Sequence, residues 1–437
     1  MLVRPLLHRA AAATGVLLLG ALLQPVTSGA VASAAVATPP RTAVPAAGRT
    51  SDPGVLSTTD QLVHDKLLAR ATGTRLGPDL AGTVTDALTG QVLWEQTPLE
   101  RQVPASNTKL VTAVNALQVL GPATRLSTTV VRGETPDRVV LVGAGDPSLT
   151  RANLRSLAAD SALALGASGV STVTVSVDDS LFPAPSLAYG WRASYVPRDV
   201  AAVRALVVDQ HRVKDTSLDA GRVFAKLLGR YGLTVRAVVR HRALPGAPLL
   251  AAVEGQPVAT MVATMLRESD NDYAEALHRL VAIKAGFAPS WTGARLAQHQ
   301  VLAGLGVDLG TAVLHDGSGL SRRNRIAPAD LVRVLSLVFD GAHPQLDSLQ
   351  HESLAVAGRT GTLAPRYRRY VTAPTRCAAG LLEAKTGSLA GVITLSGFAR
   401  GADGRVKLFS FLLNQVPSTL ATRRAVDRLA ATVTGCW

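Results

Sequence analysis

Residues 104–110 read PASNTKL and place a serine, Ser106, three positions before a lysine, Lys109. A serine hydroxyl keeps its proton at neutral pH, so it needs a base within hydrogen-bond reach before it can attack a substrate. On a helix, residues three apart lie on one face, and a helix beginning here would set the two side chains together. If burial and a second cation lower the pKa of Lys109, its neutral amine can take the serine proton. The alternative is a solvated first helical turn, which often carries such a pair.

The residues after this pair support the helix. Leu110, Val114, Leu117 and Leu120 recur at helical spacing, and a Gly-Pro pair at 121–122 ends the pattern. We therefore predict a helix that starts at the serine and packs its apolar side against a core.

Two short motifs lie further along the chain. Residues 269–271 read SDN and residues 385–387 read KTG. The first lies between two predicted helices, 257–266 and 273–285, where polar side chains can face a cleft; the alternative is a simple capping turn. The second lies on a predicted strand, 381–387. In this order, S-x-x-K, S-D-N and K-T-G resemble the signature of penicillin-binding proteins and class A β-lactamases.

Length and composition restrict the classes of function. The 437 residues suffice for two or three domains, and 47% hydrophobic residues exclude a disordered chain. Only 4% are aromatic, so there is no stacking platform for single-stranded nucleic acid, and we expect no nucleic-acid partner. The net charge of +14 would attract wall polyanions or anionic lipid. Because the basic residues form no continuous run, we interpret this charge as a solvated, arginine-rich surface.

The N-terminal segment predicts the compartment. Two arginines precede an apolar stretch at 10–23, and small residues follow as far as an A-x-A site at 32–34. This pattern predicts a signal peptide over residues 1–34, too short for a comfortable membrane span. Residues 35–55, rich in Ala, Pro, Thr and Val, are expected to form a linker. We therefore expect a secreted, cell-wall-associated protein with no integral membrane span after signal removal.

The predicted elements give an α/β (α+β layered) fold. A hairpin near the start and three strands near the end would form a five-stranded antiparallel sheet flanked by helices; these strands are 82–86, 91–95, 381–387, 391–398 and 406–413. The separation of Lys109 and Ser269 is far longer than a minimal serine-acylating domain needs. We therefore predict an inserted mixed accessory domain at residues 125–248, so that the main domain comprises 56–124 and 249–437.

With these motifs in place, the chain resembles the penicillin-binding D-alanyl-D-alanine carboxypeptidase/endopeptidase family, peptidase family S13, over roughly residues 56–434. The motifs that carry the resemblance are ASNTK at 105–109, GDPSL at 145–149, SDNDYAE at 269–275, DGSGLSR at 316–322 and AKTGS at 384–388. The resemblance implies a fold like that of serine β-lactamases and penicillin-binding transpeptidases. The insert looks shorter than in larger family members, and Ser388 stands where Thr is usual, which keeps a hydroxyl.

The resemblance also implies a catalytic role for five residues. Ser106 would attack the carbonyl between two D-alanines and form an acyl-enzyme, and Lys109 would take its proton. Lys385 would lower the pKa of Lys109 and help to bind the substrate carboxylate. Ser269 would pass the proton to the leaving amine, and Asn271 would hold the substrate amide.

The remaining site residues would bind the substrate. The family pattern assigns Thr386, Gly387 and Ser388 to the carboxylate site, and the backbone N–H groups of Ser106 and Ser388 to an oxyanion hole. Asp146 would project toward the cleft and meet a cationic amine of the stem peptide; the alternative is an Asx-type turn that only shapes its loop. We expect no cofactor and no metal, since the nine His show no H-E-x-x-H motif.

The only two cysteines, Cys377 and Cys436, are expected to form a disulfide. An exported chain meets an oxidising exterior, and in the resembled fold the closing helix before Cys436 packs across the sheet that carries Lys385. The alternative is two free thiols near a fraying end.

The sequence therefore predicts a serine-type D-Ala-D-Ala carboxypeptidase, with endopeptidase activity left open. Its expected partners are peptidoglycan stem peptides, with β-lactam antibiotics as covalent inhibitors. One alternative is a β-lactamase or esterase with the same serine chemistry, but no glutamate equivalent to the class A deacylation base is identifiable. Another is a wall protein that binds β-lactams without turnover, which intact motifs do not exclude. Ser318 lies outside any G-x-S-x-G elbow and is not expected to be a nucleophile.

Overall fold

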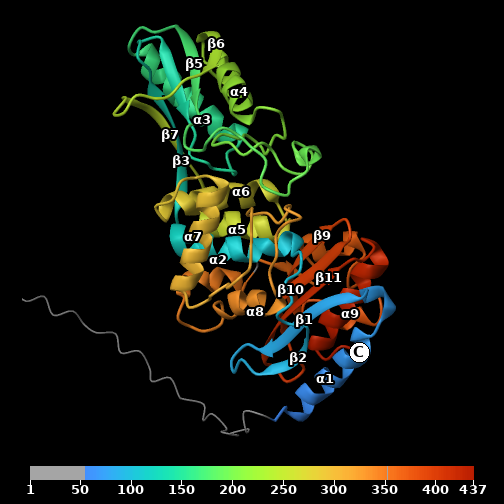
Figure 1. Cartoon of the computed structure of the whole chain (residues 1–437). Helices are drawn as coiled ribbons and strands as arrows, with labels where there is room; N and C mark the ends of the chain where they lie inside the picture. Colours follow the sequence, from blue (N-terminus) through green and yellow to red (C-terminus); the bar gives the residue numbers. More distant parts are fainter. Residues whose placement is uncertain (1–54, 352) are drawn as a thin grey trace, which may run out of the picture. The chain divides into compact units, whose positions relative to one another are not determined.

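The computed structural model describes residues 55–351 and 353–437. The predicted signal peptide and all but the last residue of the predicted linker lie outside these residues. Two sheets organise the described chain (Figure 1). The helices are α1 (Thr58–Ala71), α2 (Thr108–Leu120), α3 (Arg151–Gly166), α4 (Thr216–Arg230), α5 (Val258–Arg267), α6 (Asn271–Lys284), α7 (Trp291–Gly304), α8 (Pro328–Ser336) and α9 (Leu420–Val433). The strands are β1 (Asp79–Asp86), β2 (Val92–Gln96), β3 (Arg125–Arg132), β4 (Arg138–Val142), β5 (Thr172–Asp178), β6 (Thr234–Arg240), β7 (Leu249–Pro257), β8 (Ala355–Val356), β9 (Leu382–Leu389), β10 (Val392–Arg400) and β11 (Val406–Asn414).

The first sheet contains the five predicted strands and one more. Its order is β2-β1-β11-β10-β9-β8, and every described pair is antiparallel. The additional strand, β8, has two residues, Ala355 and Val356, which pair with β9 at the edge of the sheet. Two residues are too few to leave an alternating pattern in the sequence. The strand that carries KTG, β9, is therefore not at the edge of the sheet.

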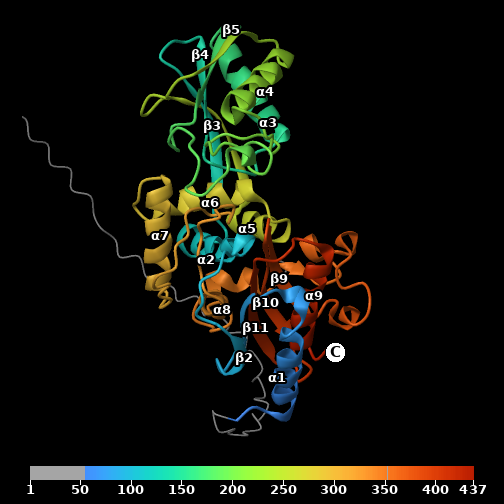
Figure 2. The ribbon, with the colours of Figure 1, turned by 45° about the vertical axis from the view of Figure 1, so that its right-hand side comes forward.

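Strand β11 shows how the sheet forms two cores. Because side chains alternate across a strand, Leu408 and Leu412 pack with α2 and α8, while Phe409, Phe411 and Leu413 pack with α1 and α9. Figures 1 and 2 show α1 and α9 together on one side of this sheet. The main unit is thus a sheet covered by helices on both faces, in agreement with the predicted layered fold.

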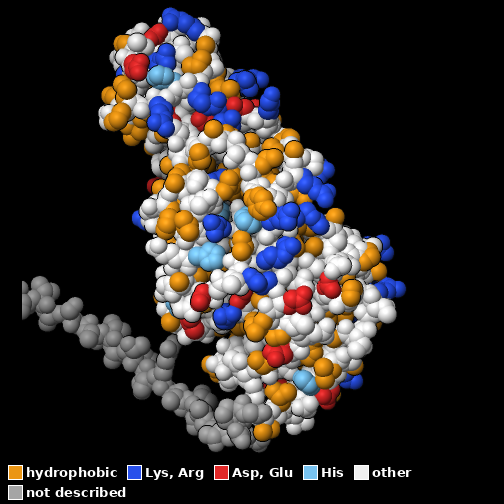
Figure 3. Space-filling view, in the orientation of Figure 1, with side chains coloured by type: hydrophobic (Ala, Val, Ile, Leu, Met, Phe, Trp, Pro, Cys, Tyr) orange, Lys and Arg blue, Asp and Glu red, His pale blue; other side chains and the backbone are white. Residues whose placement is uncertain are grey.

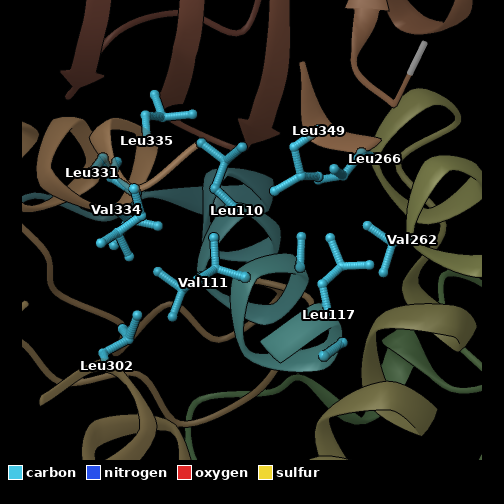
Figure 4. Packing of buried hydrophobic residues seen from close by; sticks show 14 of the residues in the cluster. Leu110, Val111, Leu117, Val262, Leu266, Leu302, Leu331, Val334, Leu335 and Leu349 are labelled. Carbon is cyan, nitrogen blue, oxygen red and sulfur yellow. The ribbon is translucent and has the colours of Figure 1, made fainter. Parts of the chain in front are cut away.

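Helix α2 is enclosed by other elements on all sides. Each residue from Thr108 to Leu117 is buried, and a helix that is covered all round belongs to a core rather than a surface. Figure 4 shows its side chains packed against those of neighbouring helices, with Leu110, Val111, Leu117, Val262, Leu266, Leu302, Leu331, Val334, Leu335 and Leu349 labelled. Close packing of this kind fixes the helix in place, so the turn before it is held rigidly.

The second sheet belongs to the inserted segment and has the order β6-β5-β4-β3-β7. The pairs β4–β5 and β5–β6 are parallel and are connected through α3 and α4, as parallel strands require a crossover. Strand β7 returns antiparallel to β3 and leads directly into α5 (Figure 1). Neither β7 nor α7 was predicted from the sequence. Because β7 comprises Leu249–Pro257, the second sheet extends past residue 248, where the inserted domain was predicted to end.

Among residues 55–351 and 353–437, the structure contains no helix with the length and apolar character needed to cross a membrane.

Candidate active site

The predicted nucleophile lies in a tight turn immediately before α2. Ser106 is the middle residue of a 3-10 turn, Ala105–Asn107, whereas the sequence had predicted that the helix starts at the serine. Ala105 has a φ of +46°, a conformation that costs energy for a residue with a side chain. The turn is enclosed on the other side by Gly319, where an added Cβ would lie 1.8 Å from the Ala105 carbonyl oxygen. Close backbone packing therefore determines the position of Ser106.

The predicted base lies beside this serine. The Nζ atom of Lys109 is 3.0 Å from Ser106 Oγ, 2.7 Å from Asn271 Oδ1 and 2.7 Å from the carbonyl oxygen of Ser318. The side chain is fully buried, and this burial lowers the pKa of Lys109 to about 8, against the opposing effect of nearby carboxylates. At pH 7, about a tenth of the molecules then hold Lys109 as the neutral amine that can accept a proton.

The second lysine is buried as well. Lys385 on β9 is fully buried and donates to the Thr386 carbonyl oxygen at 2.7 Å. Burial, and then the charge on Lys109, lower the pKa of Lys385 well below its usual value. Two neighbouring buried ammonium groups destabilise each other's charge, so the pair favours a state in which one amine is neutral.

The SDN segment both caps a helix and faces the site. Asp270 accepts from the backbone N–H groups of Asp272 and Tyr273, which caps α6. Ser269, between α5 and α6, has a φ of +61°. Asn271 begins α6, and its amide bridges Lys109 and the carbonyl oxygen of Asp199, to which Nδ2 donates at 2.8 Å. Asp270 therefore forms the predicted capping turn, while Ser269 and Asn271 face the cavity.

A cavity of about 500 Å³ opens in front of these groups. Of the predicted site residues, Ser106, Ser269, Asn271, Thr386 and Ser388 line it, while the buried lysines lie behind this lining. The structure thus brings the three motifs together around one space that is large enough for a peptide end.

Gly387 has a packing requirement of its own. A Cβ at this position would lie 2.1 Å from Thr394 Oγ1 and 2.9 Å from the carbonyl oxygen of Pro104. The strand β9 passes so close to the nucleophile turn that only glycine fits without displacement.

Several residues that were not predicted from the sequence also line the cavity. They are Arg192, Tyr195, Arg198, Asp199, Gly319, Leu320, Arg322, Thr362, Tyr367, Arg369, Leu389, Ala390 and Arg423. Figure 3 shows Lys and Arg side chains gathered over the region between α6 and β9. Thr362 receives the hydroxyl hydrogen bond of Thr386 at 2.8 Å. Arg322 belongs to the DGSGLSR motif at 316–322. The other arginines lie in segments with no recognisable spacing, so no sequence signal indicated them.

Asp146 lies outside the residues that line this cavity. Its Oδ1 accepts from the backbone N–H of Ser148 at 2.7 Å and from the Ser148 hydroxyl at 2.6 Å, the bonds of an Asx-type turn. The carboxylate is buried, which raises its pKa, and it packs against Gly255. These contacts match the loop-shaping alternative, and a role toward the substrate stays a prediction.

The predicted disulfide is present between Cys377 and Cys436, with a Cα–Cα distance of 5.8 Å. It connects the segment before β9 to the end of the chain after α9. Among the residues that the structure describes, no group of three or more His, Cys, Asp or Glu could hold a metal ion.

Comparisons with known proteins agree with this geometry. The sequence profile of the D-Ala-D-Ala carboxypeptidase 3 (S13) family matches residues 63–213 and 196–433. The chain is 35% identical over 435 residues to carboxypeptidase DacB of Mycolicibacterium smegmatis, covering 94% of this chain and 92% of that protein. It is 36% identical over 378 residues to a carboxypeptidase of Mycobacterium tuberculosis, covering 82% and 80%. The crystal structure of penicillin binding protein 4 from Haemophilus influenzae has the same fold, with a TM-score of 0.72 at 21% identity over 83% of this chain and 97% of that one. That protein has also been solved with a β-lactam.

Proposed function

The chain belongs to the D-Ala-D-Ala carboxypeptidase 3 (S13) family, and from this premise we propose that Ser106 cleaves the D-Ala-D-Ala bond of peptidoglycan stem peptides. The enzyme is a serine-type D-Ala-D-Ala carboxypeptidase. The observation that carries the residue assignment is the 3.0 Å contact between Ser106 Oγ and Lys109 Nζ. A buried lysine with a pKa of about 8 beside a serine is the arrangement that an activated hydroxyl requires.

In the acylation step, neutral Lys109 takes the proton from Ser106 Oγ as that oxygen attacks the carbonyl carbon of the penultimate D-Ala. The negative charge that develops on the carbonyl oxygen is held by the backbone N–H groups of Ser106 and Ser388. The C–N bond then breaks, and the leaving amine receives a proton through Ser269. Water attacks the resulting ester, which releases the shortened peptide and returns the proton to Ser106.

Substrate binding follows from the charge of the cavity. The terminal carboxylate meets the hydroxyls of Thr386 and Ser388, with the charge of Lys385 behind them. Arg322 and Arg423 line the same cavity and add positive potential. Asn271, held by Lys109, fixes the substrate amide. A penultimate carbonyl presented in this way stands in front of Ser106.

A β-lactam carries a strained amide next to a carboxylate and would enter the same site. The related Haemophilus protein has been solved with a β-lactam, which supports this part of the proposal. We propose that β-lactams acylate Ser106 and block the enzyme. We also propose that the chain is exported by its first 34 residues and works at the cell wall, where its substrate is found.

Defined muropeptides test the proposed function. Purified protein is incubated with a monomeric pentapeptide ending in D-Ala-D-Ala and with a cross-linked dimer, and the products are weighed by mass spectrometry. Loss of one D-Ala from the monomer, absent in Ser106→Ala, is the expected result. Cleavage of the dimer would add endopeptidase activity. Labelling by penicillin without release of D-Ala from either substrate would contradict the peptidase and favour a β-lactam-binding protein without turnover.

A further inference from the structure

The loop at 316–321 supplies one of the three groups that hold Lys109. The carbonyl oxygen of Ser318 accepts from Lys109 Nζ at 2.7 Å. The other two groups are the nucleophile itself and Asn271. Because the ammonium can donate only three hydrogen bonds, the position of the Ser318 carbonyl helps to decide where the amine points.

This loop is anchored by a buried carboxylate that the mechanism above does not use. Glu275 lies on α6 one turn after Asn271, with 1% of its surface exposed. Its Oε1 accepts from the N–H of Ser318 at 2.8 Å, and its Oε2 accepts from the N–H of Gly317 at 3.2 Å. Helix α6 therefore contacts Lys109 twice, directly through Asn271 and through the Ser318 backbone from Glu275.

The same loop also forms hydrogen bonds with residues other than Glu275. Thr112 on α2 donates to the Gly317 carbonyl oxygen at 2.8 Å. Asp316 accepts from Trp191 Nε1 and from Asn324 Nδ2, each at 2.7 Å, and from the N–H of Ser321 at 2.7 Å. The loop thus has several supports that do not involve Glu275. A buried carboxylate is costly, and a glutamine in its place could accept at least one of the two backbone bonds, so the negative charge calls for an explanation of its own.

The charge of Glu275 acts on Lys109. Burial and the neighbouring Asp316 raise the pKa of Glu275 to about 7, against the opposing effects of the hydrogen bonds from Ser318 and Gly317 and of the charge on Arg279, so Glu275 is an anion at the pH where Lys109 titrates. The groups that face Lys109 with a charge are Glu275, Asp270 and Asp272 from α6 and its cap, Asp316 from the loop, and Lys385 from β9. Glu275 has the largest effect among the carboxylates. His278, one turn after Glu275 on α6, is kept neutral because burial lowers its pKa to about 3.

We propose that Glu275 is a positioning residue for the reaction at Ser106: its carboxylate anchors the Ser318 carbonyl against Lys109 and holds a negative charge that is separated from this lysine only by the Ser318 backbone. The residue does not touch the substrate. This inference rests on the proposed function, because it assigns a supporting role to the same serine and lysine. Removing the negative charge makes the ammonium less favourable, so Lys109 should lose its proton at lower pH.

The test measures how fast a fluorescent penicillin acylates the protein between pH 6 and 10. Wild type should give a rate constant that rises with pH and levels off, with a midpoint near 8. In Glu275→Gln the midpoint should move at least about 0.5 pH unit toward acid, and the plateau should fall because the weaker base accelerates the reaction less. Glu275→Asp keeps the charge but shortens the reach, so its midpoint should stay within about 0.2 unit of wild type while its plateau falls.

Asp330→Asn is the matched control. Asp330 is also a buried carboxylate with a raised pKa that accepts a backbone N–H, from Ala327, but it lies on α8 and is not among the carboxylates with the largest effect on Lys109. Its midpoint should match wild type. An unmoved midpoint in Glu275→Gln, or an equal shift in the control, overturns the proposal. If Glu275→Gln does not fold, a midpoint shifted toward acid in Glu275→Asp overturns it as well. If wild type is not acylated at any pH, the proposed function itself fails, and the two failures are thus distinguishable.

Discussion

Replacing Lys109 by arginine keeps a cation beside Ser106 but removes the base. Lys109 is fully buried, with its pKa lowered to about 8, so about a tenth of it is neutral at pH 7. Arg279 indicates how far burial can lower the pKa of an arginine in this protein, because its own pKa is lowered to about 10. An arginine at 109 with that pKa would be neutral in only about one molecule in a thousand. Acylation should therefore slow by at least about 100-fold, and by far more if the guanidinium keeps its ordinary pKa.

Stopped-flow measurement of fluorescent penicillin binding at pH 7 gives the acylation rate constant directly. Lys226→Arg, an exposed exchange on α4, is the control and should match wild type. Thermal melting of all three proteins shows whether the fold is intact. The same assay on wild type should rise with pH and level off above about 8, because only the neutral amine is active. A Lys109→Arg rate within tenfold of wild type, or a flat wild-type profile from pH 6 to 9, would refute Lys109 as the base.

Three further changes test other parts of the account. Replacing Cys377 and Cys436 by serine opens a loop of 59 residues and should cost about 4 kcal/mol of unfolding free energy in urea titration; an unchanged midpoint would exclude a stabilising bridge. Gly319→Ala forces a methyl group against the carbonyl of the nucleophile turn and should slow acylation more than about tenfold, whereas Gly310→Ala, at a positive φ in open space, should not. Asp146→Asn should slow cleavage of a stem peptide with a free amine but not acylation by penicillin; equal effects on both, or none, would leave only the loop-shaping role.

The motif residues were predictable because each chemical role requires a particular residue type at short spacing. Ser106 and Lys109 must lie three residues apart so that their side chains meet, and KTG must lie on a strand facing them. The layered fold followed from strand-length apolar runs such as β11, which is buried on both faces, and from the apolar spacing of α2. The 3-10 geometry at Ser106 could not be foreseen, because it results from the close approach of Gly319, more than 200 residues away in the sequence.

Other features depend on tertiary contacts that leave no local pattern. Strand β7 reads LLAAVEGQP, without clear alternation, and is a strand because it pairs with β3. The arginines of the cavity come from loops around Arg192 and Arg198, from the loop after α7, from the segment before β9 that contains Arg369, and from α9. The anchoring role of Glu275 was hidden for the same reason: its two partners lie 42 and 43 residues further along the chain.

The most direct test of the central claim is to locate the bond that penicillin forms. The protein is treated with penicillin and digested with trypsin, and the peptide that gains the mass of the antibiotic is identified by mass spectrometry. The account predicts that the label is on residues 102–109, the tryptic peptide that contains Ser106, and that Ser106→Ala takes up none. A label on the peptide that contains Ser318, or persistent labelling of Ser106→Ala, would contradict it.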